Sequence, residues 1–386
     1  MLRAFLKSIS RSAPLILLLL TFVAAISFAA VSHLVARYNA NQQARGRKLY
    51  DRGLSSAKAG NYGDAIAEFR AALTCEPANS QYQLSLARAL RDSNDPRRLD
   101  EAESYLVALW QRTPQDAAVN LALARVAAHR GNIEDATRYY HNAMYGVWNS
   151  NADANRNKAR IELIQFLIGR QALANADSEL IALATSLPSD PAEHMRAAEL
   201  FVQARDDAGA LAQYKEVLLH EPTNAAAMAG AGRSAYDAGA YTTADHYLQA
   251  AVRANPQDTH SRELLATTEL ILHVDPFRWY ISDAERNRRI ATAFDQAEKR
   301  LQSCAAQVGV NLSTASPSPL SDLQATWTKN KPELANLRSD TETDLPDTLM
   351  DIVFQIEQKT SEICGSPQGP DLALLLISQK RETSGQ

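Results

Sequence analysis

The sequence predicts an all-α protein: an α-solenoid of repeated helix–turn–helix units with an N-terminal transmembrane helix and a C-terminal helical cap. Three observations favour this class. Alanine is abundant while large β-branched residues are scarce, glycine and proline each occur only 15 times in 386 residues, and one pattern recurs about every 34 residues. Alanine favours helix, and an all-β chain of many short strands would need more turn residues.

The overall composition limits the function classes. Hydrophobic residues make up 46% of the chain and charged residues 22%, which is typical of a folded protein rather than a disordered one. The 40 basic and 44 acidic residues leave a net charge of −4, so we expect no nucleic-acid partner. Three cysteines are too few for a scaffold held by many disulfides.

An uncharged, strongly apolar segment occupies residues 13–36, after a basic flank at residues 1–12. A membrane-spanning helix needs about 20 apolar residues, whereas the apolar region of a cleaved signal peptide has about 7–15. We therefore expect residues 13–36 to be an uncleaved signal anchor of a single-pass membrane protein. Small residues near its end, such as Ala29 and Ala30, leave cleavage as the alternative.

The flanks of this segment bear on its orientation. Three basic residues precede it and five follow it closely, a count that favours a body in the cytoplasm. Long domains, however, cross membranes largely regardless of charge, and a short basic start before one apolar segment resembles an export signal. We expect the body on the extracytoplasmic, periplasmic side, with a cytoplasmic body as the alternative.

The recurring pattern is a small residue, a large residue four positions later and a proline eight positions after that. The first two lie on one face of a helix, where the small side chain lets a neighbouring helix approach and the large one fills the adjacent gap. The small residues are Ala65, Ala102, Ala176, Ala210 and Ala244, the large ones include Phe69 and Tyr214, and the prolines include Pro77, Pro188, Pro222 and Pro256. The unit at 117–150 lacks the proline but keeps the spacing, with Ala136 and Tyr140.

Turn residues separate the two helices of a unit, as at 60–62, 131–132 and 239–241. The second unit has three extra residues, and Asn-Asp-Pro at 94–96 predicts that this insertion lies in its turn. The turn of the unit at 151–190 is the least clearly marked.

A helix–turn–helix unit of 34 residues is typical of the tetratricopeptide repeat, and residues 46–256 resemble six such repeats, with a seventh first helix at 259–273. The family's signature positions in the first unit hold Leu49, Gly53, Ala65, Phe69 and Pro77, and Gly232 has the place of Gly53 in a later unit. The resemblance implies a solenoid over residues 46–273 whose first helices line a concave groove. It further implies a protein that binds a protein or peptide partner and is not an enzyme.

The alignment of the repeats on one another predicts which residues of the first helices face the groove. They include Tyr50, Leu84, Arg88, Leu121, Arg125 and Arg233. Because arginine suits bidentate recognition of a carboxylate, we expect residues 84–125 to help bind an acidic or carboxylate-bearing peptide. The alternative is that these arginines are solvated or paired with local acids. The Lys/Asn pattern of the family's carboxylate-clamp members is not reproduced.

Motifs for chemistry are lacking. Residues 230–235 spell a dinucleotide-type glycine fingerprint, but they fall inside a predicted helix rather than after a strand. The eight histidines show no metal-binding spacing, and no nucleophile or phosphate-loop motif occurs. We expect no metal, no cofactor and no small-molecule substrate.

The C-terminal third continues with helices. We expect a capping element at 274–308, with a capping box of Ser282 and Glu285 opening a helix to about residue 307, and then a linker and helical tail over 309–386. The linker is polar at 309–322, and further helices are predicted at about 321–338, 346–363 and 370–380. The aromatic residues Phe277, Trp279 and Tyr280 are expected to be core wedges under the cap rather than a binding site.

The positions of two cysteines indicate whether the body of the protein lies in an oxidising or a reducing compartment. A disulfide between Cys304 and Cys364 would close a loop of about 60 residues, stabilise the fold by roughly 4 kcal/mol and fit an oxidising compartment. Free thiols in a reducing cytosol are the alternative. Cys75, at the end of a repeat helix, is expected to be a small buried hydrophobic residue.

Together these features predict a membrane-tethered scaffold that holds a protein partner through its groove, in cell-envelope assembly or secretion. One alternative is an assembly factor or chaperone for exported cofactor proteins or pili. Another is an unrecognised enzyme with a site in the C-terminal tail.

Overall fold

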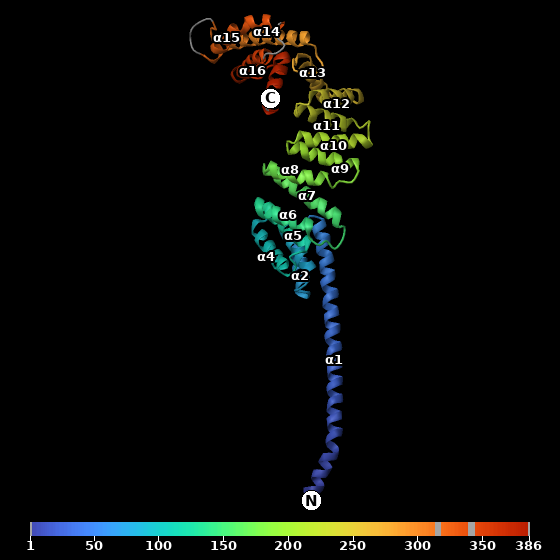
Figure 1. Cartoon of the computed structure of the whole chain (residues 1–386). Coiled ribbons are helices and arrows are strands. Elements are labelled where there is room, and N and C mark those ends of the chain that lie inside the picture. Colours follow the sequence, from blue (N-terminus) through green and yellow to red (C-terminus); the bar gives the residue numbers. More distant parts are fainter. Residues whose placement is uncertain (1, 313–317, 339–343, 385–386) are drawn as a thin grey trace. The chain divides into compact units, whose positions relative to one another are not determined.

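The computed structural model describes residues 2–312, 318–338 and 344–384, and within them the side chains of residues 17–382. These ranges form seventeen α-helices and one 3-10 helix and contain no β-strand, only an isolated bridge between Asp116 and Val147 (Figure 1). The chain divides into two compact units, Met1–Ala172 and Leu173–Gln386. The all-α class predicted from composition and repeat spacing is confirmed.

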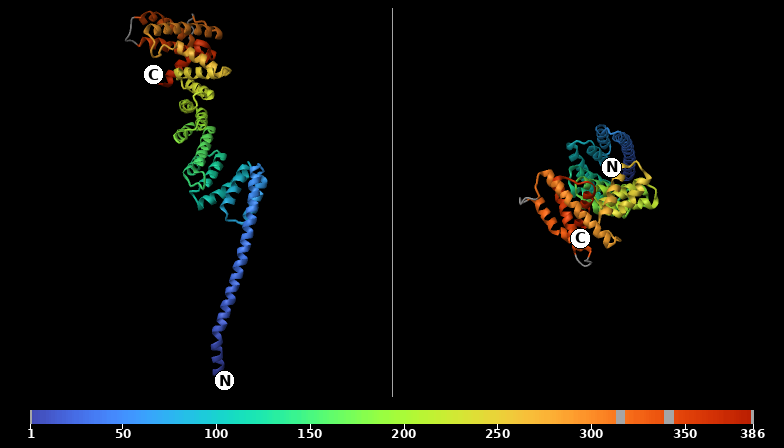
Figure 2. Two further views of the ribbon diagram at one scale, coloured as in Figure 1. Left: turned by 90° about the vertical axis from the view of Figure 1, so that its right-hand side faces the viewer. Right: turned by 90° about the horizontal axis from the view of Figure 1, so that it is seen from above.

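The first helix is much longer than the others. Helix α1 (Leu2–Lys58) runs without a break from the apolar segment into the first helix of the first repeat, and its N-terminal part extends beyond the other helices of its unit (Figure 2). Its apolar side chains from Leu17 to Val35 are exposed. Among the described residues this is the one helix that is long and apolar enough to cross a membrane, and its position near the N-terminus suits an anchor or a signal sequence alike.

The other helices of the first unit are α2 (Tyr62–Cys75), α3 (Ser80–Asp92), α4 (Pro96–Arg112), α5 (Ala117–Arg130), α6 (Ile133–Tyr145) and α7 (Ala152–Gly169). They pack as successive pairs, α1 on α2, α3 on α4 and α5 on α6. Asn or Asp side chains begin several of them; the Asn79 side chain, for example, accepts the backbone N–H of Gln81 at 3.1 Å.

The small residues of the pattern are buried between the packed helices. Ala65, Ala102 and Ala136 have no exposed surface. The large partners Phe69 and Tyr140 are also buried. Gly53 lies directly under the Phe69 ring, since a Cβ added there would be 2.6 Å from a ring carbon.

The three extra residues of the second repeat do not lie in the turn between its two helices. The turn between α3 and α4 has three residues, 93–95, the same number as the turn at 59–61. Helix α4 has 17 residues where α2 has 14, so the insertion lengthens the second helix by 17 − 14 = 3 residues. Pro96 suits the first position of a helix, where no N–H bond is lost, and it lets the helix begin early.

The second compact unit, Leu173–Gln386, begins with six repeat helices. They are α8 (Leu173–Ala184), α9 (Pro191–Gln203), α10 (Asp207–His220), α11 (Ala225–Asp237), α12 (Tyr241–Ala254) and α13 (Thr259–Val274). Here too the small residues Ala176, Ala210 and Ala244 are fully buried. Gly232 packs against Leu248, and Gly230 lies under the Tyr214 ring. Pro188, Pro222 and Pro256 follow second helices and are exposed, as turn residues should be.

The unit with the poorly marked turn is the one at which the chain divides. Its first helix, α7, belongs to the first compact unit and its second helix, α8, to the second. Between them Gln171 adopts a left-handed backbone conformation with φ of 58°. That conformation is uncommon for a residue other than glycine, and neither glycine nor proline occupies this position to indicate the turn in the sequence.

Four α-helices and a 3-10 helix complete the second unit: α14 (Asp283–Val308), α15 (Pro319–Asn330), the 3-10 helix Lys331–Arg338, α16 (Leu345–Cys364) and α17 (Gly369–Ser384). They share one core, in which Trp327 stacks on Phe294 at 5.3 Å and donates its indole N–H to the Phe294 carbonyl. Helix α17 also packs against α13. The single helix expected at 321–338 is instead two elements, α15 and the 3-10 helix. Part of the linker expected at 309–322, residues 313–317, lies outside the described residues.

Three predictions about side chains in this region are corrected. Trp279 and Tyr280 are not core wedges, since they are 86% and 100% exposed; Phe277 alone is partly buried. Helices α16 and α17 cover the apolar faces of α13 and α14 instead, which leaves no core position for the two other rings. Of the capping box only one half forms: the Ser282 hydroxyl accepts the Glu285 N–H, but the Glu285 carboxylate binds Arg288 and Arg289.

The cysteines lie at the ends of two of these helices. A disulfide bond joins Cys304 of α14 to Cys364 of α16, with the Cα atoms 5.7 Å apart, within the usual range for such a bond. Arg300 donates to the Gly365 carbonyl at 2.8 Å beside it. Cys75 is a free thiol that is partly exposed rather than buried, because α2 ends at that residue.

A buried acid lies near this bond. Glu357 of α16 has no exposed surface, and its two carboxylate oxygens have no hydrogen-bond partner among the residues that the structure describes. Burial raises the pKa of Glu357 to about 8, and the neighbouring Asp371 charge acts in the same direction while Arg300 opposes it. The carboxyl group is therefore protonated near neutral pH.

The contact between Gly53 and Phe69 predicts the effect of a single added carbon. Gly53→Ala should lower the free energy of unfolding by about 1–2 kcal/mol, because the strain of overpacking exceeds the helix propensity that alanine gains. Gly63→Ala is the matched control, since a Cβ there meets nothing within 4 Å. Thermal unfolding followed by circular dichroism should show a lower Tm for the first variant and an unchanged or higher Tm for the second. Equal Tm values would contradict the packing described.

The burial of Glu357 predicts a pH dependence of stability. The folded protein keeps a proton that the unfolded chain, with an ordinary pKa of 4.5, has released, so the free energy of unfolding should fall between about pH 4.5 and pH 8. The slope is at most about 1.4 kcal/mol per pH unit. Glu357→Gln should remove this contribution and raise the Tm above the wild-type value at alkaline pH. Glu362→Gln, on the exposed side of α16, should leave the pH profile unchanged; a Glu357→Gln profile parallel to wild type would refute the assignment.

Candidate partner-binding surface

Three arginines gather on the first helices of two successive repeats in the first unit. Arg88 and Arg91 come from α3 and Arg125 from α5. Arg88 is partly buried, and its pKa is lowered by burial and further by the charges of Arg125 and Arg91. The sequence predicted Arg88 and Arg125 as groove residues, and the structure adds Arg91 as a neighbour of Arg88.

Two donors of this cluster are unused. The buried Nε of Arg88 and the buried Nη1 of Arg91 have no hydrogen-bond acceptor in the described part of the chain. Burying an unpaired donor costs about 1–3 kcal/mol, and more when the group is charged. A carboxylate that reached these nitrogens would recover that energy.

Arg125, by contrast, is already engaged. Its Nε and Nη2 donate to the two carboxylate oxygens of Glu162 on α7, at 2.7 and 2.6 Å. Burial opposes the charge on Arg125, but these bonds raise its pKa overall. For this residue the alternative of pairing with a local acid holds. Glu162 follows Arg125 by 37 residues, and this near-repeat spacing is the signal in the sequence that could indicate the pair.

Two of the expected groove residues belong to the core. Tyr50 is 8% exposed; it stacks on Tyr82 at 4.7 Å, and its hydroxyl lies 3.0 Å from that of Ser85. Leu121 is 5% exposed. The repeat spacing predicted that both residues face the groove, and their burial in the core corrects this prediction. Leu84, which is partly buried and packs against the same core, keeps some exposure.

Arg233 lies on α11, in the second unit, and is exposed. Its charge opposes the burial that raises the pKa of Asp237 and of Tyr214. It therefore has acidic and phenolic neighbours of its own and is not a member of the Arg88 cluster.

The structure offers little for metal or dinucleotide chemistry. The described part of the chain contains no group of three or more His, Cys, Asp or Glu residues suited to a metal ion. Residues 230–235 lie within α11, so the glycine fingerprint lacks the strand-to-helix turn that such a site needs.

Comparisons with known proteins agree with the repeat. The model of the tetratricopeptide repeat family matches residues 50–117 and 195–259. No curated protein matches the chain.

Solved structures with a similar repeat were also found. PilF of Pseudomonas aeruginosa is 17% identical with a TM-score of 0.39, over 58% of this chain and 99% of that one. PilW, described as a type IV pilus biogenesis factor, is 14% identical with a TM-score of 0.38, over 56% and 96%. The C-terminal part of a repeat protein from Cytophaga hutchinsonii is 14% identical with a TM-score of 0.41, over 71% and 98%.

The helix pairs, their buried alanines and the two matched segments, one in each compact unit, lead to one assignment. Tetratricopeptide repeats are protein-interaction modules, and a solenoid of them exposes an extended binding surface. Both units of the chain contain tetratricopeptide repeats, at residues 50–117 and 195–259.

Proposed function

We propose that this protein is a membrane-tethered scaffold whose repeats bind an acidic segment of a protein partner, in cell-envelope assembly or secretion. The parts we assign are an anchor at residues 13–36 after a basic flank at 1–12, a solenoid at 46–273, a capping element at 274–308 and a tail at 309–386. The repeat family supports the binding of a protein, and the apolar part of α1 supports the tether.

The observation that carries the proposal is the Arg88 cluster. A partly buried guanidinium with an unused donor, beside two further arginines, is suited to charge-assisted hydrogen bonds from a carboxylate. Glu162 and Asp92 hold Arg125 and Arg91 in place by ion pairs of 2.6 Å, so Arg88 is the cation left for a ligand. An acidic side chain or a C-terminal carboxylate of the partner matches this chemistry.

The tether places the repeats near the membrane surface. Helix α1 is continuous, and the ten residues from Ala36 to Gly46, where α1 first contacts the next helices, span about 15 Å at 1.5 Å per residue. A partner held by the first repeats would thus stay close to the bilayer. We place the body on the extracytoplasmic side, which the disulfide between Cys304 and Cys364 supports.

Arg88→Ala should weaken partner binding by about tenfold or more while leaving the fold intact, because it removes an unpaired buried donor rather than a satisfied one. A photo-crosslinking residue at Leu84 in the native membrane captures the bound segment, and mass spectrometry identifies it. We expect a segment rich in Asp or Glu, or one ending in a free carboxylate. Capture of this segment should be lost in the Arg88→Ala and Arg88→Glu variants. It should be retained in the control variant Arg97→Glu, which changes an exposed arginine of the same compact unit. Undiminished capture by Arg88→Glu would overturn the proposal.

The disulfide predicts the result of an alkylation experiment. When the protein is purified from membranes without reductant and treated with iodoacetamide, peptides containing Cys304 and Cys364 should be found linked and unmodified. Cys75, the free thiol, should be alkylated and serves as the internal control. Alkylation of all three cysteines would contradict both the bond and the extracytoplasmic location.

A further inference from the structure

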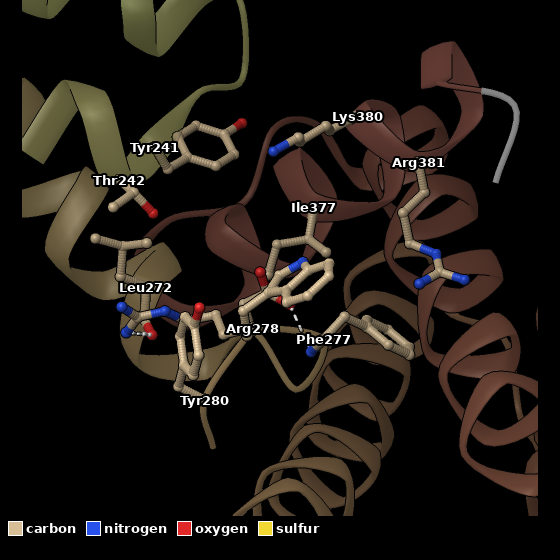
Figure 3. A pocket seen from close by; sticks show the side chains of 11 residues that line it. Tyr241, Thr242, Leu272, Phe277, Arg278, Tyr280, Ile377, Lys380 and Arg381 are labelled. Atoms are coloured by element: carbon tan, nitrogen blue, oxygen red, sulfur yellow. Dashed lines mark hydrogen bonds between the residues drawn. The ribbon is translucent and has the colours of Figure 1, made fainter.

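A cavity of about 400 Å³ lies in the second unit where four elements meet: the end of α13, the loop at 275–282, the start of α12 and the last turns of α17 (Figure 3). Its volume is in the range of ligand pockets. It is formed only because α17 packs back against α13, so no single stretch of sequence indicates it.

The loop that borders the cavity is held firmly. Arg289 donates to the carbonyl of Leu272 at 3.0 Å and to that of Asp275 at 2.8 Å, and Arg278 donates to the same Leu272 carbonyl at 2.9 Å. The Asp275 carboxylate accepts the N–H of Phe277 at 2.9 Å. These bonds fix the loop from the α13 side, so its shape does not depend on a ligand.

This fixed loop exposes two large aromatic residues at the cavity. Trp279 is 86% exposed and Tyr280 is fully exposed, with their ring centres 6.4 Å apart. Tyr280 has a φ of 68°, a conformation that costs energy for a bulky side chain and that the surrounding bonds must maintain. Aromatic residues in rigid, exposed positions are typical of the anchor points of protein interfaces.

The cavity is positively charged. Three cations line it, Arg278, Lys380 and Arg381, against one acid, Asp275. Lys380 extends toward the Tyr241 ring, 5.3 Å from its centre, while Arg278 lies on the side of Leu272 and Tyr280 (Figure 3).

The two remaining charged groups have supporting roles. Arg381 forms an ion pair with Asp347 at 2.8 Å and stacks over Phe277 at 4.0 Å. Asp275 is partly buried, and burial raises its pKa although the N–H of Phe277 and the charges of Lys380, Arg278 and Arg289 oppose this. The lining of the cavity therefore has three cations against one acid, which leaves it with an excess of positive charge.

We propose that this cavity is a second binding site, which takes an acidic peptide segment of a partner protein. Its carboxylates lie against Arg278 and Lys380, and its apolar side chains pack on Trp279 and Tyr280. The hollowed shape fits a peptide better than the flat surface of a lipid bilayer. The site is independent of the Arg88 cluster, which belongs to the first unit.

The test uses the full-length protein in phosphatidylcholine nanodiscs, with Arg88→Ala introduced so that the first proposed site is silent. The probe is a short fluorescein-labelled peptide of alternating Leu and Asp, and binding is measured by fluorescence anisotropy. Replacing Asp by Lys, or Leu by Ser, in the peptide should weaken binding, because each change leaves one of the two parts of the site, the cations or the aromatic rings, without its partner. Adding Trp279→Ala or Lys380→Glu to the protein should each lower the affinity by about tenfold or more.

Matched controls carry the same chemical changes elsewhere. Tyr145→Ala removes an exposed aromatic ring of the first unit, and Lys329→Glu reverses an exposed lysine on α15; neither should change the affinity. The proposal is overturned if the Arg88→Ala protein does not bind the probe, or if Trp279→Ala and Lys380→Glu bind it unchanged with an unaltered circular dichroism spectrum. It is also overturned if phosphatidylglycerol vesicles, and not the peptide, are bound in a Trp279-dependent manner.

Discussion

The close approach of successive helices is the constraint on which the rest of this structure depends. In the five packed helix pairs α1–α2, α3–α4, α5–α6, α9–α10 and α11–α12, the second helix has an alanine with no exposed surface at the contact, and a large side chain lies four residues later on the same face. Gly53 shows how narrow the gap is, since the Phe69 ring occupies the place where a Cβ would lie. Because one methyl group is enough for each contact, the contact does not constrain the other positions of the repeat. The remaining first-helix positions are thereby available for binding.

This freedom explains why charge lies within the packed repeats. Arg125 and Glu162 form a bidentate pair between helices of neighbouring repeats, which satisfies both groups and needs no external partner. Arg88, next to them, is desolvated to a similar degree without a comparable acid. A scaffold whose fold is maintained by small apolar contacts can keep one poorly satisfied cation. A carboxylate bound there, as we propose, would recover the resulting cost in stability.

The C-terminal helices solve a problem that every open repeat array has, an apolar face at its end. Helices α14, α16 and α17 cover it with a core of their own, reinforced by the disulfide between Cys304 and Cys364. Since α17 completes this cover, the aromatic residues of the loop after α13 are not needed in the core. Trp279 and Tyr280 instead stand exposed beside a cationic cavity. The end of the repeats thus has a surface chemistry different from that of the Arg88 cluster.

The sequence by itself determined the all-α class, the position of the apolar helix, the period of the repeat and the residues at helix contacts. These properties depend on local spacing, which a helix turns directly into position on a face. It predicted that Tyr50 and Leu121 face the groove. Only the tertiary structure decided that both are buried, because burial depends on how other helices pack over a position.

The partners of the charged residues were likewise a tertiary matter. Glu162 is 37 residues from Arg125, and Lys380 reaches Tyr241 across 139 positions (380 − 241) because α17 returns to the last repeat. Such pairings depend on long-range packing, which has no period along the chain. The sequence therefore determined the framework of this protein, and the tertiary structure decided which of its charges and aromatic rings remain available to a partner.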